Sequence, residues 1–559
     1  MLRLLAPESR LDRSITGRST AWASIALVAV LVLSCAPAGV EEPADTGPAS
    51  SYQELVDLFL EFREFQAPDL VGDVPDYTPP AIEARRQGLV DLRQRFDALN
   101  VDSWPVSEKI DYLVVRSEIN GLDFYLRVLR PWSRDPGFYL QSQRGAGPTR
   151  VATLRRPREW PMPDDQLESF RNRLRAIPAV YEQAKENLQD VPGDLARLAI
   201  HYLDEEIEIY TELIPRLAEH HPDLVADAER GATTVREYGA WLEANLDTMT
   251  AEAGIGIDNY TWMLQNVLLV PYTWQDMLDI VEREDDRVWA FLKLEENRNR
   301  DLPPLEPVRE RYEHWERQKD ALDTVVQFIL DDEIFTVPDY LDSLAYLGPA
   351  PEPGPLPEVR DYFENTADRE PMPEQTHEFI GHWLDHERYD RDNRPIRGGE
   401  RLYAIGMIRS EGWAFGLEEL MMHAGYLDGR PQRGREIVYL QTAFRSCRAR
   451  ADLLMHSNGY TLMDAIDYCV ACAPKGWLPK DGLHVWYEMQ TNLRWPGWHT
   501  GMVVGKQEFM KLLGDRASQL REDFVLREFT DEFLAAGNIP FSLIRWEMTG
   551  QADEIDELW

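Results

Sequence analysis

The segment THEFIGHWLDH, residues 376–386, contains the side chains of a metal-binding helix in an unusual spacing. In the common pattern H-E-x-x-H, two histidines four residues apart lie on one face of a helix and bind one metal ion. Here three residues rather than two separate Glu378 from the second histidine, so His377 and His382 are five residues apart. Whether this spacing can form a metal site depends on the local geometry of the helix.

An ideal α-helix would keep these two histidines apart. At about 100° per residue, positions i and i+5 differ by about 140° around the helix axis, so the two rings could not bind one ion. A π-type bulge under-winds the helix and brings i and i+5 to one face. Gly381, which has no side chain, would ease that distortion. The sequence therefore predicts that His377 and His382 bind one metal only if the helix bulges.

A second histidine pair would need no distortion. His382 and His386 are four residues apart and share a helical face. In that arrangement Trp383 follows the first ligand, at the place where a hydrolytic site needs an acidic base. This pair stays open as an alternative, as does a helix that binds no metal.

A carboxylate on a following helix is the expected third ligand. The segment SEGWAFGLEELM, residues 410–421, contains Glu411 and Glu418, which are seven residues apart and therefore on one face. We expect Glu411 to bind the metal and Glu418 to hydrogen-bond one of the ligands. Alternatively, Glu411 could be a solvated acid that stabilises the first turn of its helix, and Glu418 could be a solvated surface acid.

These residue types could carry out metal-assisted hydrolysis with one zinc ion. Zinc held by two neutral imidazoles and one carboxylate keeps a position open for water and lowers the pKa of that water, which becomes the nucleophile. Glu378, next to the first ligand, is the expected general base: it would take the proton of the water and pass it to the leaving amine.

Four further polar residues are candidates for contacts with the reacting groups. His456 is the candidate hydrogen-bond donor to the oxyanion, because Asp452, one helical turn earlier, could orient its imidazole. Arg448 and Arg494 could bind a peptide carboxylate. The alternatives are a satisfied core or surface histidine for His456 and helix-packing ion pairs for the two arginines.

The N-terminus has the features of an export signal. Residues 1–34 contain several arginines and then the apolar run WASIALVAVLVLS, which is too short to span a bilayer. The residues VLSC, ending at Cys35, resemble the lipobox of bacterial lipoproteins, which implies cleavage before Cys35 and a lipid anchor on its thiol. An ordinary signal peptide is the alternative. The resemblance to Gram-negative lipoproteins, with Pro37 instead of an acid, favours the outer membrane, facing the periplasm.

The remaining chain is predicted to be mainly α-helical. Residues 35–50 are rich in Pro, Ala, Gly and acids and predict a flexible tether. Beyond them, segments such as YQELVDLFLEF repeat apolar residues every three or four positions, and alternating strand patterns are scarce. We expect an N-terminal helical region over residues 51–335 and a C-terminal helical region with the metal site over residues 336–559, packed as one body around a deep cleft. The Pro-rich segment 337–374 leads directly into the histidine motif.

Composition narrows the range of partners. The formal net charge of −39 argues against nucleic acid, because phosphate binding needs a basic surface. Apart from Cys35, three cysteines remain, and an exported location permits a disulfide. Cys447 could pair with Cys469 or Cys472, or all three could be buried thiols.

Four segments resemble the bacterial domain of unknown function 885 family. Its members carry His-Glu…Pro-Gly-His, EGWALYxE, R-x-x-D-x-G-x-H and a segment with PGQ; the counterparts here are THEFIGHWLD, EGWAFGLE, RARADLLMH and LRWPGWHTGMVVGK. The resemblance extends over most of residues 51–540. EGWA is also similar to the NEGFA segment of aminopeptidase N-type enzymes, where the glutamate binds zinc. The H-E-x-x-G-H spacing is similar to that of dipeptidyl peptidase III, a mainly helical zinc peptidase. These resemblances imply a zincin-like helical fold of the gluzincin type.

The chain departs from the family pattern at three positions. Ile380 replaces the proline before Gly381, with one residue fewer between the histidines. Trp498 stands where glutamine is usual, and Met502 stands where tyrosine is usual. The changes at Trp498 and Met502 are expected to alter contacts with the transition state or the choice of substrate. The three expected metal ligands are retained.

The sequence therefore predicts a zinc-dependent metallopeptidase that hydrolyses peptides in the cell envelope. One alternative is a non-catalytic envelope lipoprotein whose decayed site binds a peptide or another partner. Another is a metal-dependent hydrolase of a different amide or an ester.

Overall fold

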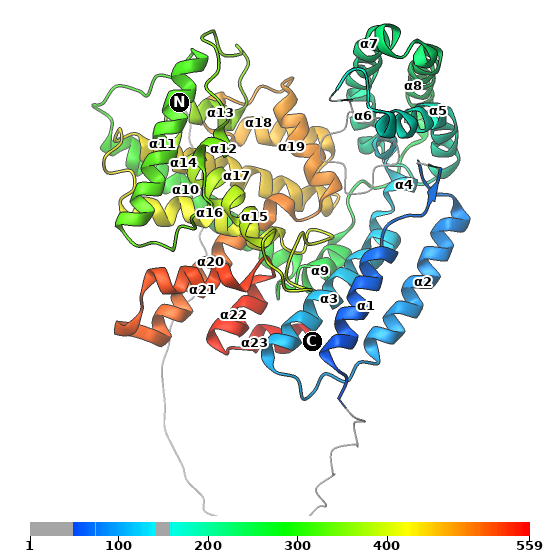
Figure 1. Cartoon of the computed structure of the whole chain (residues 1–559). Helices are drawn as coiled ribbons and strands as arrows, with labels where there is room; N and C mark the ends of the chain where they lie inside the picture. The colour runs from blue at the N-terminus through cyan, green and yellow to red at the C-terminus, as the bar shows by residue number, and fades with distance from the viewer. Residues whose placement is uncertain (1–48, 73, 141–156, 158) are drawn as a thin grey trace, which may run out of the picture. The chain divides into compact units, whose positions relative to one another are not determined.

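The apolar periodicity of the sequence corresponds to long amphipathic helices in the computed structural model (Figure 1). The structure describes residues 49–559 except residues 73, 141–156 and 158. The predicted signal peptide, Cys35 and nearly all of the predicted tether lie outside the described residues. No helix in the described part of the chain combines the length and the hydrophobicity needed to cross a bilayer.

The helices before the predicted boundary at residue 335 are mostly long. They are α1 (Tyr52–Phe65), α2 (Pro79–Asp97), α3 (Val106–Phe124), α4 (Pro131–Arg134), α5 (Asp164–Asn187), α6 (Gly193–His201), α7 (Leu203–His220), α8 (Val225–Asn245), α9 (Ile257–Asn266), α10 (Trp274–Arg298) and α11 (Arg311–Asp331). A π-helix, η1 (Tyr125–Leu129), follows α3, and 3-10 turns occur at η2 (Pro136–Tyr139), η3 (Pro222–Leu224) and η4 (Leu246–Thr248).

The helices after this boundary carry the predicted metal ligands. They are α12 (Ser343–Leu347), α13 (Tyr362–Ala367), α14 (Met372–Gln375), α15 (Leu384–Tyr389), α16 (Met407–Ala424), α17 (Gly434–His456), α18 (Leu462–Cys472), α19 (Leu483–Arg494), α20 (Trp498–Leu520), α21 (Leu526–Ala536), α22 (Phe541–Thr549) and α23 (Asp553–Leu558). A second π-helix, η5 (Thr376–Trp383), lies between α14 and α15, and 3-10 turns occur at η6 (Pro474–Gly476) and η7 (Arg521–Asp523).

Strands are almost absent from the described residues, and the predicted mainly α fold is confirmed. The strands β1 (Leu70–Val71) and β2 (Val74–Pro75) form a short antiparallel pair. The deep cleft stays a prediction.

Local sequence signals set several helix starts. Ser51 at the start of α1 accepts a hydrogen bond from the backbone N–H of Glu54, whose carboxylate accepts one from the backbone N–H of Ser51. Thr273 and Asp276 form the same reciprocal pair at the start of α10. Each pair satisfies backbone groups that a helix end would otherwise leave without partners.

Helix α17 lies at the centre of the packing and is buried along nearly its whole length. Helices α10, α18, α19 and α20 pack against it. Since α10 comes from the region before residue 335 and α17 from the region after it, helices on both sides of the predicted boundary share one hydrophobic core.

The contact between α16 and α20 is unusually close because both helices present a glycine. A Cβ atom placed on Gly412 would collide with the backbone of Gly505, and one placed on Gly505 would collide with the backbone of α16. The two main chains therefore touch directly, next to Glu411.

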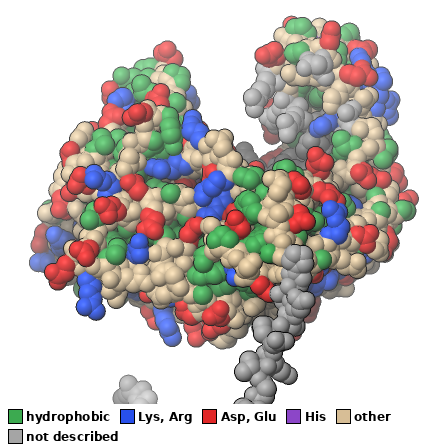
Figure 2. All heavy atoms as spheres, turned by 60° about the horizontal axis from the view of Figure 1, so that its bottom comes forward, with side chains coloured by type: hydrophobic (Ala, Val, Ile, Leu, Met, Phe, Trp, Pro, Cys, Tyr) green, Lys and Arg blue, Asp and Glu red, His purple; other side chains and the backbone are tan. Residues whose placement is uncertain are grey.

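The Pro-rich segment 337–374 contains the short helices α12, α13 and α14. Helix α12 packs against α11 and against η5, so this segment reaches the helix with the two histidines. On the face shown in Figure 2, acidic and basic side chains are interspersed rather than gathered into one patch of a single sign.

Candidate metal centre

The histidine motif forms a π-helix, as the spacing predicts. Residues 376–383 adopt π geometry, with α-helical turns before and after them. The rings of His377 and His382 are nearly perpendicular, and their Nε2 atoms are 3.1 Å apart. The local prediction of a bulge is therefore confirmed, and the five-residue spacing places both rings on one side.

The predicted third ligand lies opposite the two rings. Glu411 Oε2 is 3.9 Å from His377 Nε2 and 3.5 Å from His382 Nε2. The approach of the two helices depends on Gly381, since a Cβ on this residue would fall 2.5 Å from the Cβ of Ala414 in α16. Gly381 thus permits close packing of η5 on α16, a reason that the sequence alone did not provide.

The three ligand atoms fit a single zinc ion. In a tetrahedral site with bonds of about 2.1 Å, neighbouring ligand atoms lie about 3.4 Å apart. The three separations observed here, from 3.1 to 3.9 Å, lie around that value. Glu411 Oε2 is also buried without a hydrogen-bond donor among the described residues, as expected of an atom reserved for a cation. Two imidazoles and one carboxylate are a usual donor set for zinc.

Glu418 lies behind the first histidine. Its Oε1 atom is 2.8 Å from His377 Nδ1 and 2.9 Å from Arg445 Nη2. Contacts of this type orient the ring so that its other nitrogen faces the metal. On the second histidine, His382 Nδ1 is 3.3 Å from Ser410 Oγ.

The ligands strongly affect one another's protonation. Burial opposes charge on His382, but the carboxylate of Glu411 outweighs it and raises the pKa of His382 to about 9. Burial likewise opposes charge on Glu411, but His382 and then His377 lower the pKa of this carboxyl to about 2. Burial, together with Arg445, lowers the pKa of His377.

Glu378, the predicted base, is exposed, in contrast to the two buried residues on either side of it. Two residues that the sequence interpretation missed lie near it. Burial and then Glu378 raise the pKa of Glu374 to about 8, and Glu374 accepts a hydrogen bond of 3.0 Å from Gln441. The sequence could have indicated Glu374, because it lies one helical turn before Glu378.

The second missed residue is Tyr346 of α12. Its ring centre is 5.0 Å from that of Phe379 and 5.9 Å from that of Trp383. Burial, followed by Glu378 and Glu374, raises the pKa of the Tyr346 hydroxyl. The Pro-rich segment therefore places a phenol ring against the helix that carries the predicted base, an arrangement that no local pattern indicates.

His456 and Asp452 lie in the core. His456 Nε2 is 2.8 Å from the carbonyl oxygen of Asn492 and 3.5 Å from Asp452 Oδ1, and Nδ1 accepts a hydrogen bond from the backbone N–H of Ile255. Asp452 also accepts a hydrogen bond of 2.8 Å from the Thr500 hydroxyl. Burial lowers the pKa of His456 to about 4 and raises that of Asp452 to about 7. These contacts match the alternative of a satisfied core histidine, and they do not bring His456 to the metal ligands.

Both candidate arginines make buried ion pairs. Arg494 donates two hydrogen bonds to Asp135, at 2.6 and 3.2 Å. Arg448 donates to Glu488 at 2.7 Å, and Met502, at the position where the family has tyrosine, lies 3.5 Å from Arg448. These arrangements match the helix-packing alternative.

Glu488 is the centre of a buried charged cluster. Its carboxylate also contacts His484 and His499, each at 2.8 Å. Burial, followed by Arg448, lowers the pKa of His499, and Glu411 acts on it in the opposite direction. Arg448 therefore lies in a charged network with Glu488, His484 and His499.

The structure resolves the cysteine alternatives. Cys447 of α17 and Cys472 of α18 form a disulfide, with their Cα atoms 6.1 Å apart. Cys469 is a buried thiol.

Comparisons with known proteins support the fold and part of the family resemblance. A family described as bacterial protein of unknown function (DUF885) matches residues 376–548, which is less than half of the chain. No curated protein matches the chain. One similar solved structure is a proposed lipoprotein of unknown function from Shewanella oneidensis, with 16% identity, a TM-score of 0.69 and coverage of 89% of this chain and 100% of that chain. A proposed lipoprotein from Colwellia psychrerythraea shows 16% identity, a TM-score of 0.64 and coverage of 90% and 100%.

The likeness to gluzincin peptidases draws no support from these comparisons. What they establish is a mainly helical fold shared over most of the chain, with the DUF885 match covering η5, α16, α17 and the segments that follow.

Proposed function

We propose that this protein is a zinc-dependent hydrolase of peptide bonds. The observation that carries the proposal is the convergence of His377, His382 and Glu411 on one point, with ligand atoms 3.1 to 3.9 Å apart and Glu378 next to the first histidine. A metal ion needs three or more His, Cys, Asp or Glu ligand atoms close together. Within the described part of the chain, His377, His382 and Glu411 meet this condition, with all three ligand atoms within 4.8 Å of one another.

In the proposed hydrolysis, different residues of the chain would hold the metal ligands in place and transfer the proton. When bound, zinc would act as a Lewis acid that activates water and polarises a carbonyl group. Glu378 is exposed and can accept a proton from an attacking water and return it to the leaving amine. Glu418, which pairs with Arg445, contacts the ring of His377, and Tyr346 packs against Phe379 and Trp383 on the helix that carries Glu378.

The proposed location is the cell envelope. The lipobox-like sequence at Cys35 and the description of two similar structures as proposed lipoproteins support an exported protein with an N-terminal lipid anchor. We propose the outer membrane, facing the periplasm, with envelope peptides as substrates.

Metal content and turnover, measured on the full-length chain, test this proposal. We expect about one zinc per chain in the wild type and in Glu378→Gln, and none in His377→Ala. The wild type should hydrolyse a panel of short peptides, and Glu378→Gln should be slower by about a hundredfold or more, as expected for loss of a general base.

The outcomes separate the proposed function from its alternative. Zinc binding without hydrolysis of peptides or acyl esters would favour a binding lipoprotein with a decayed site, which the changes at Trp498 and Met502 make the second candidate. A wild-type protein without zinc, even after zinc is supplied, would overturn the proposal.

A further inference from the structure

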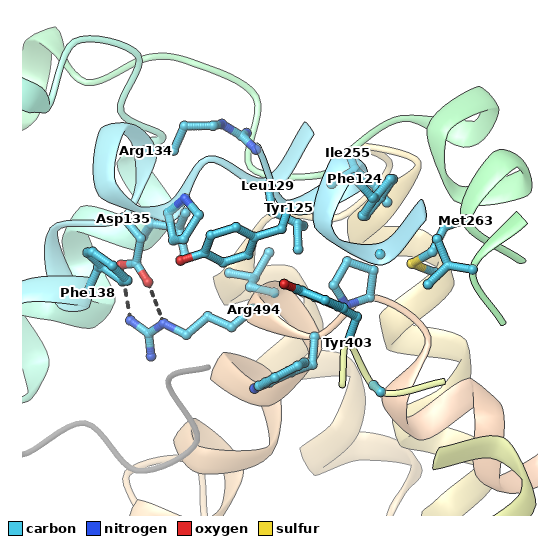
Figure 3. Close-up of a pocket in the computed structure, with 18 of the residues that line it drawn as sticks. Phe124, Tyr125, Leu129, Arg134, Asp135, Phe138, Ile255, Met263, Tyr403 and Arg494 are labelled. Carbon is cyan, nitrogen blue, oxygen red and sulfur yellow. Dashed lines mark hydrogen bonds and ion pairs between the residues drawn. The ribbon is translucent and has the colours of Figure 1, made fainter. Parts of the chain in front are cut away.

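A cavity that shares no lining residue with the proposed metal centre lies among α3, η1, α4, α9 and the end of α19. Its volume is about 100 Å³. Figure 3 shows that the labelled side chains around it are mainly apolar and come from distant parts of the sequence, among them Phe124, Leu129, Ile255 and Met263. An apolar cavity of this kind favours an apolar ligand group over water.

Two arginines line this cavity, and they differ in their partners. Arg494 is paired with the carboxylate of Asp135, as the dashed lines in Figure 3 show. Arg134 is only 8% exposed, and its Nη2 atom donates to the carbonyl oxygen of Glu252 at 2.6 Å. Within the described residues, Arg134 has no carboxylate at ion-pair distance, and its buried Nε atom has no hydrogen-bond partner.

A buried guanidinium that pairs directly with no carboxylate is costly, because more distant charges repay its desolvation only in part. Asp190 and Asp135 favour the charge of Arg134 without forming an ion pair with it, and Asp190 already pairs with Arg130. Burial, and then the neighbouring Arg130, lower the pKa of Arg134. The neighbouring carboxylate of Asp135 is already occupied by Arg494 and by the backbone N–H of Gly137. An anionic group brought in by a ligand would therefore complete the surroundings of Arg134.

We propose that this cavity binds a small carboxylate with a short, branched apolar chain, whose carboxylate pairs with Arg134. A cavity of about 150 Å³ lined by Leu, Ile and Phe holds benzene, so a volume of about 100 Å³ suits roughly four carbons beside the carboxylate. A free branched-chain fatty acid and the C-terminal leucine of a peptide share this chemistry. The inference does not depend on metal binding or on hydrolysis.

Calorimetric titration of the full-length chain, with metal chelated to prevent turnover, tests the inference. The probes are 3-methylbutanoate, its neutral counterpart 3-methylbutanamide, and N-acetyl-Ala-Ala-Leu with a free or an amidated C-terminus. We expect at least one of the two carboxylates to bind and its amide to bind about tenfold more weakly or worse, because hydrogen bonds to charged groups are the stronger ones. Binding of the small acid would identify a free acid as ligand, and binding of the peptide alone would identify a peptide C-terminus.

Three variants make the test specific. Arg134→Gln removes the charge, and Leu129→Trp fills the cavity from a half-buried position; each should weaken binding at least tenfold. Arg85→Gln is the matched control, since Arg85 is also buried and donates to a backbone carbonyl, but lies outside the cavity; it should leave binding unchanged. The inference is overturned if neither carboxylate binds, if the amides bind equally well, or if Leu129→Trp and Arg134→Gln, both folded by thermal melting, bind like the wild type.

Discussion

Gly381 of the π-helix lies directly against Ala414 of α16, so that a Cβ on Gly381 would fall 2.5 Å from the Cβ of Ala414. This contact fixes the distance between the helix that carries the two histidines and the helix that carries Glu411. The proposed metal centre therefore depends on a residue whose side chain cannot itself bind metal.

Gly381→Ala should therefore weaken zinc binding. The added methyl group has no room, so overpacking should cost about 1–3 kcal/mol of stability and move Glu411 away from the histidines. The zinc dissociation constant, measured by chelator competition, should rise by about tenfold or more. Gly514→Ala is the matched control, because Gly514 is also helical but has nothing within 4 Å of the added Cβ. It should stabilise the protein slightly and leave zinc binding unchanged.

The two histidine pairs weighed from the sequence can be separated by mutation. His382 belongs to both pairs, whereas His386 is exposed and lies 3.2 Å from Asp390. His386→Ala should retain about one zinc per chain, and His382→Ala should lose it. Elemental analysis of the two variants after identical purification measures this. Loss of zinc in His386→Ala with retention in His377→Ala would show that the undistorted pair is the site.

Protonation of Glu419 should lower the free energy of unfolding at acidic pH. Burial opposes its charge, but Lys506 and then Arg287 outweigh burial and lower the pKa of Glu419 from its usual 4.5 to about 2. Because the folded-state pKa is depressed, this stabilisation is present above pH 4.5 and is lost as pH falls toward 2, by up to about 3 kcal/mol. Urea unfolding at several pH values should show a shallower acid dependence in Glu419→Gln than in the wild type.

A surface glutamate provides the control for this experiment. Glu61 pairs with Arg95, but both side chains are about half exposed, so Glu61→Gln should change stability by no more than about 1 kcal/mol at any pH. Parallel acid dependences for wild type and Glu419→Gln would contradict the assigned role of the Lys506 pair.

The disulfide between Cys447 and Cys472 should stabilise the C-terminal helices. It closes a loop with a sequence separation of 25, for which the chain-entropy account gives about 3 kcal/mol. Cys472→Ala should lower the free energy of unfolding by about this amount, whereas Cys469→Ala should have a smaller effect, since Cys469 is a single buried thiol. Equal stabilities of Cys472→Ala and wild type under oxidising conditions would contradict this.

The sequence predicted the fold class and the local geometry of the histidine helix, but not every contact around it. The π-helix could be predicted because spacing alone decides whether His377 and His382 share a face, and Glu411 because its segment lies on a following helix. The position of Tyr346 could not be predicted, since its ring reaches η5 only through tertiary packing of a Pro-rich segment.

Tertiary packing, which local sequence patterns do not predict, also explains why the contacts of Arg494 and His456 do not support their suggested roles. Arg494 pairs with Asp135, which is 359 positions earlier in the chain, and no sequence pattern indicates such a distant partner. His456 was singled out because Asp452 precedes it by one turn, yet its Nε2 atom also meets the main chain of Asn492, in another helix. Local spacing identifies residues that can interact, whereas packing decides which side chains point into the site.

The glycine contact between Gly412 and Gly505 has a consequence for which ions the protein can select. Because the main chains of α16 and α20 touch there, no change of rotamer can alter their separation, and the backbone of Glu411 next to the contact is held in place. The proposed centre, with two imidazoles and one carboxylate, does not offer the six to eight oxygen ligands at 2.3–2.6 Å that Ca²⁺ requires. The protein should therefore discriminate among cations by ionic radius, and favour a small ion of low coordination number before any substrate is present.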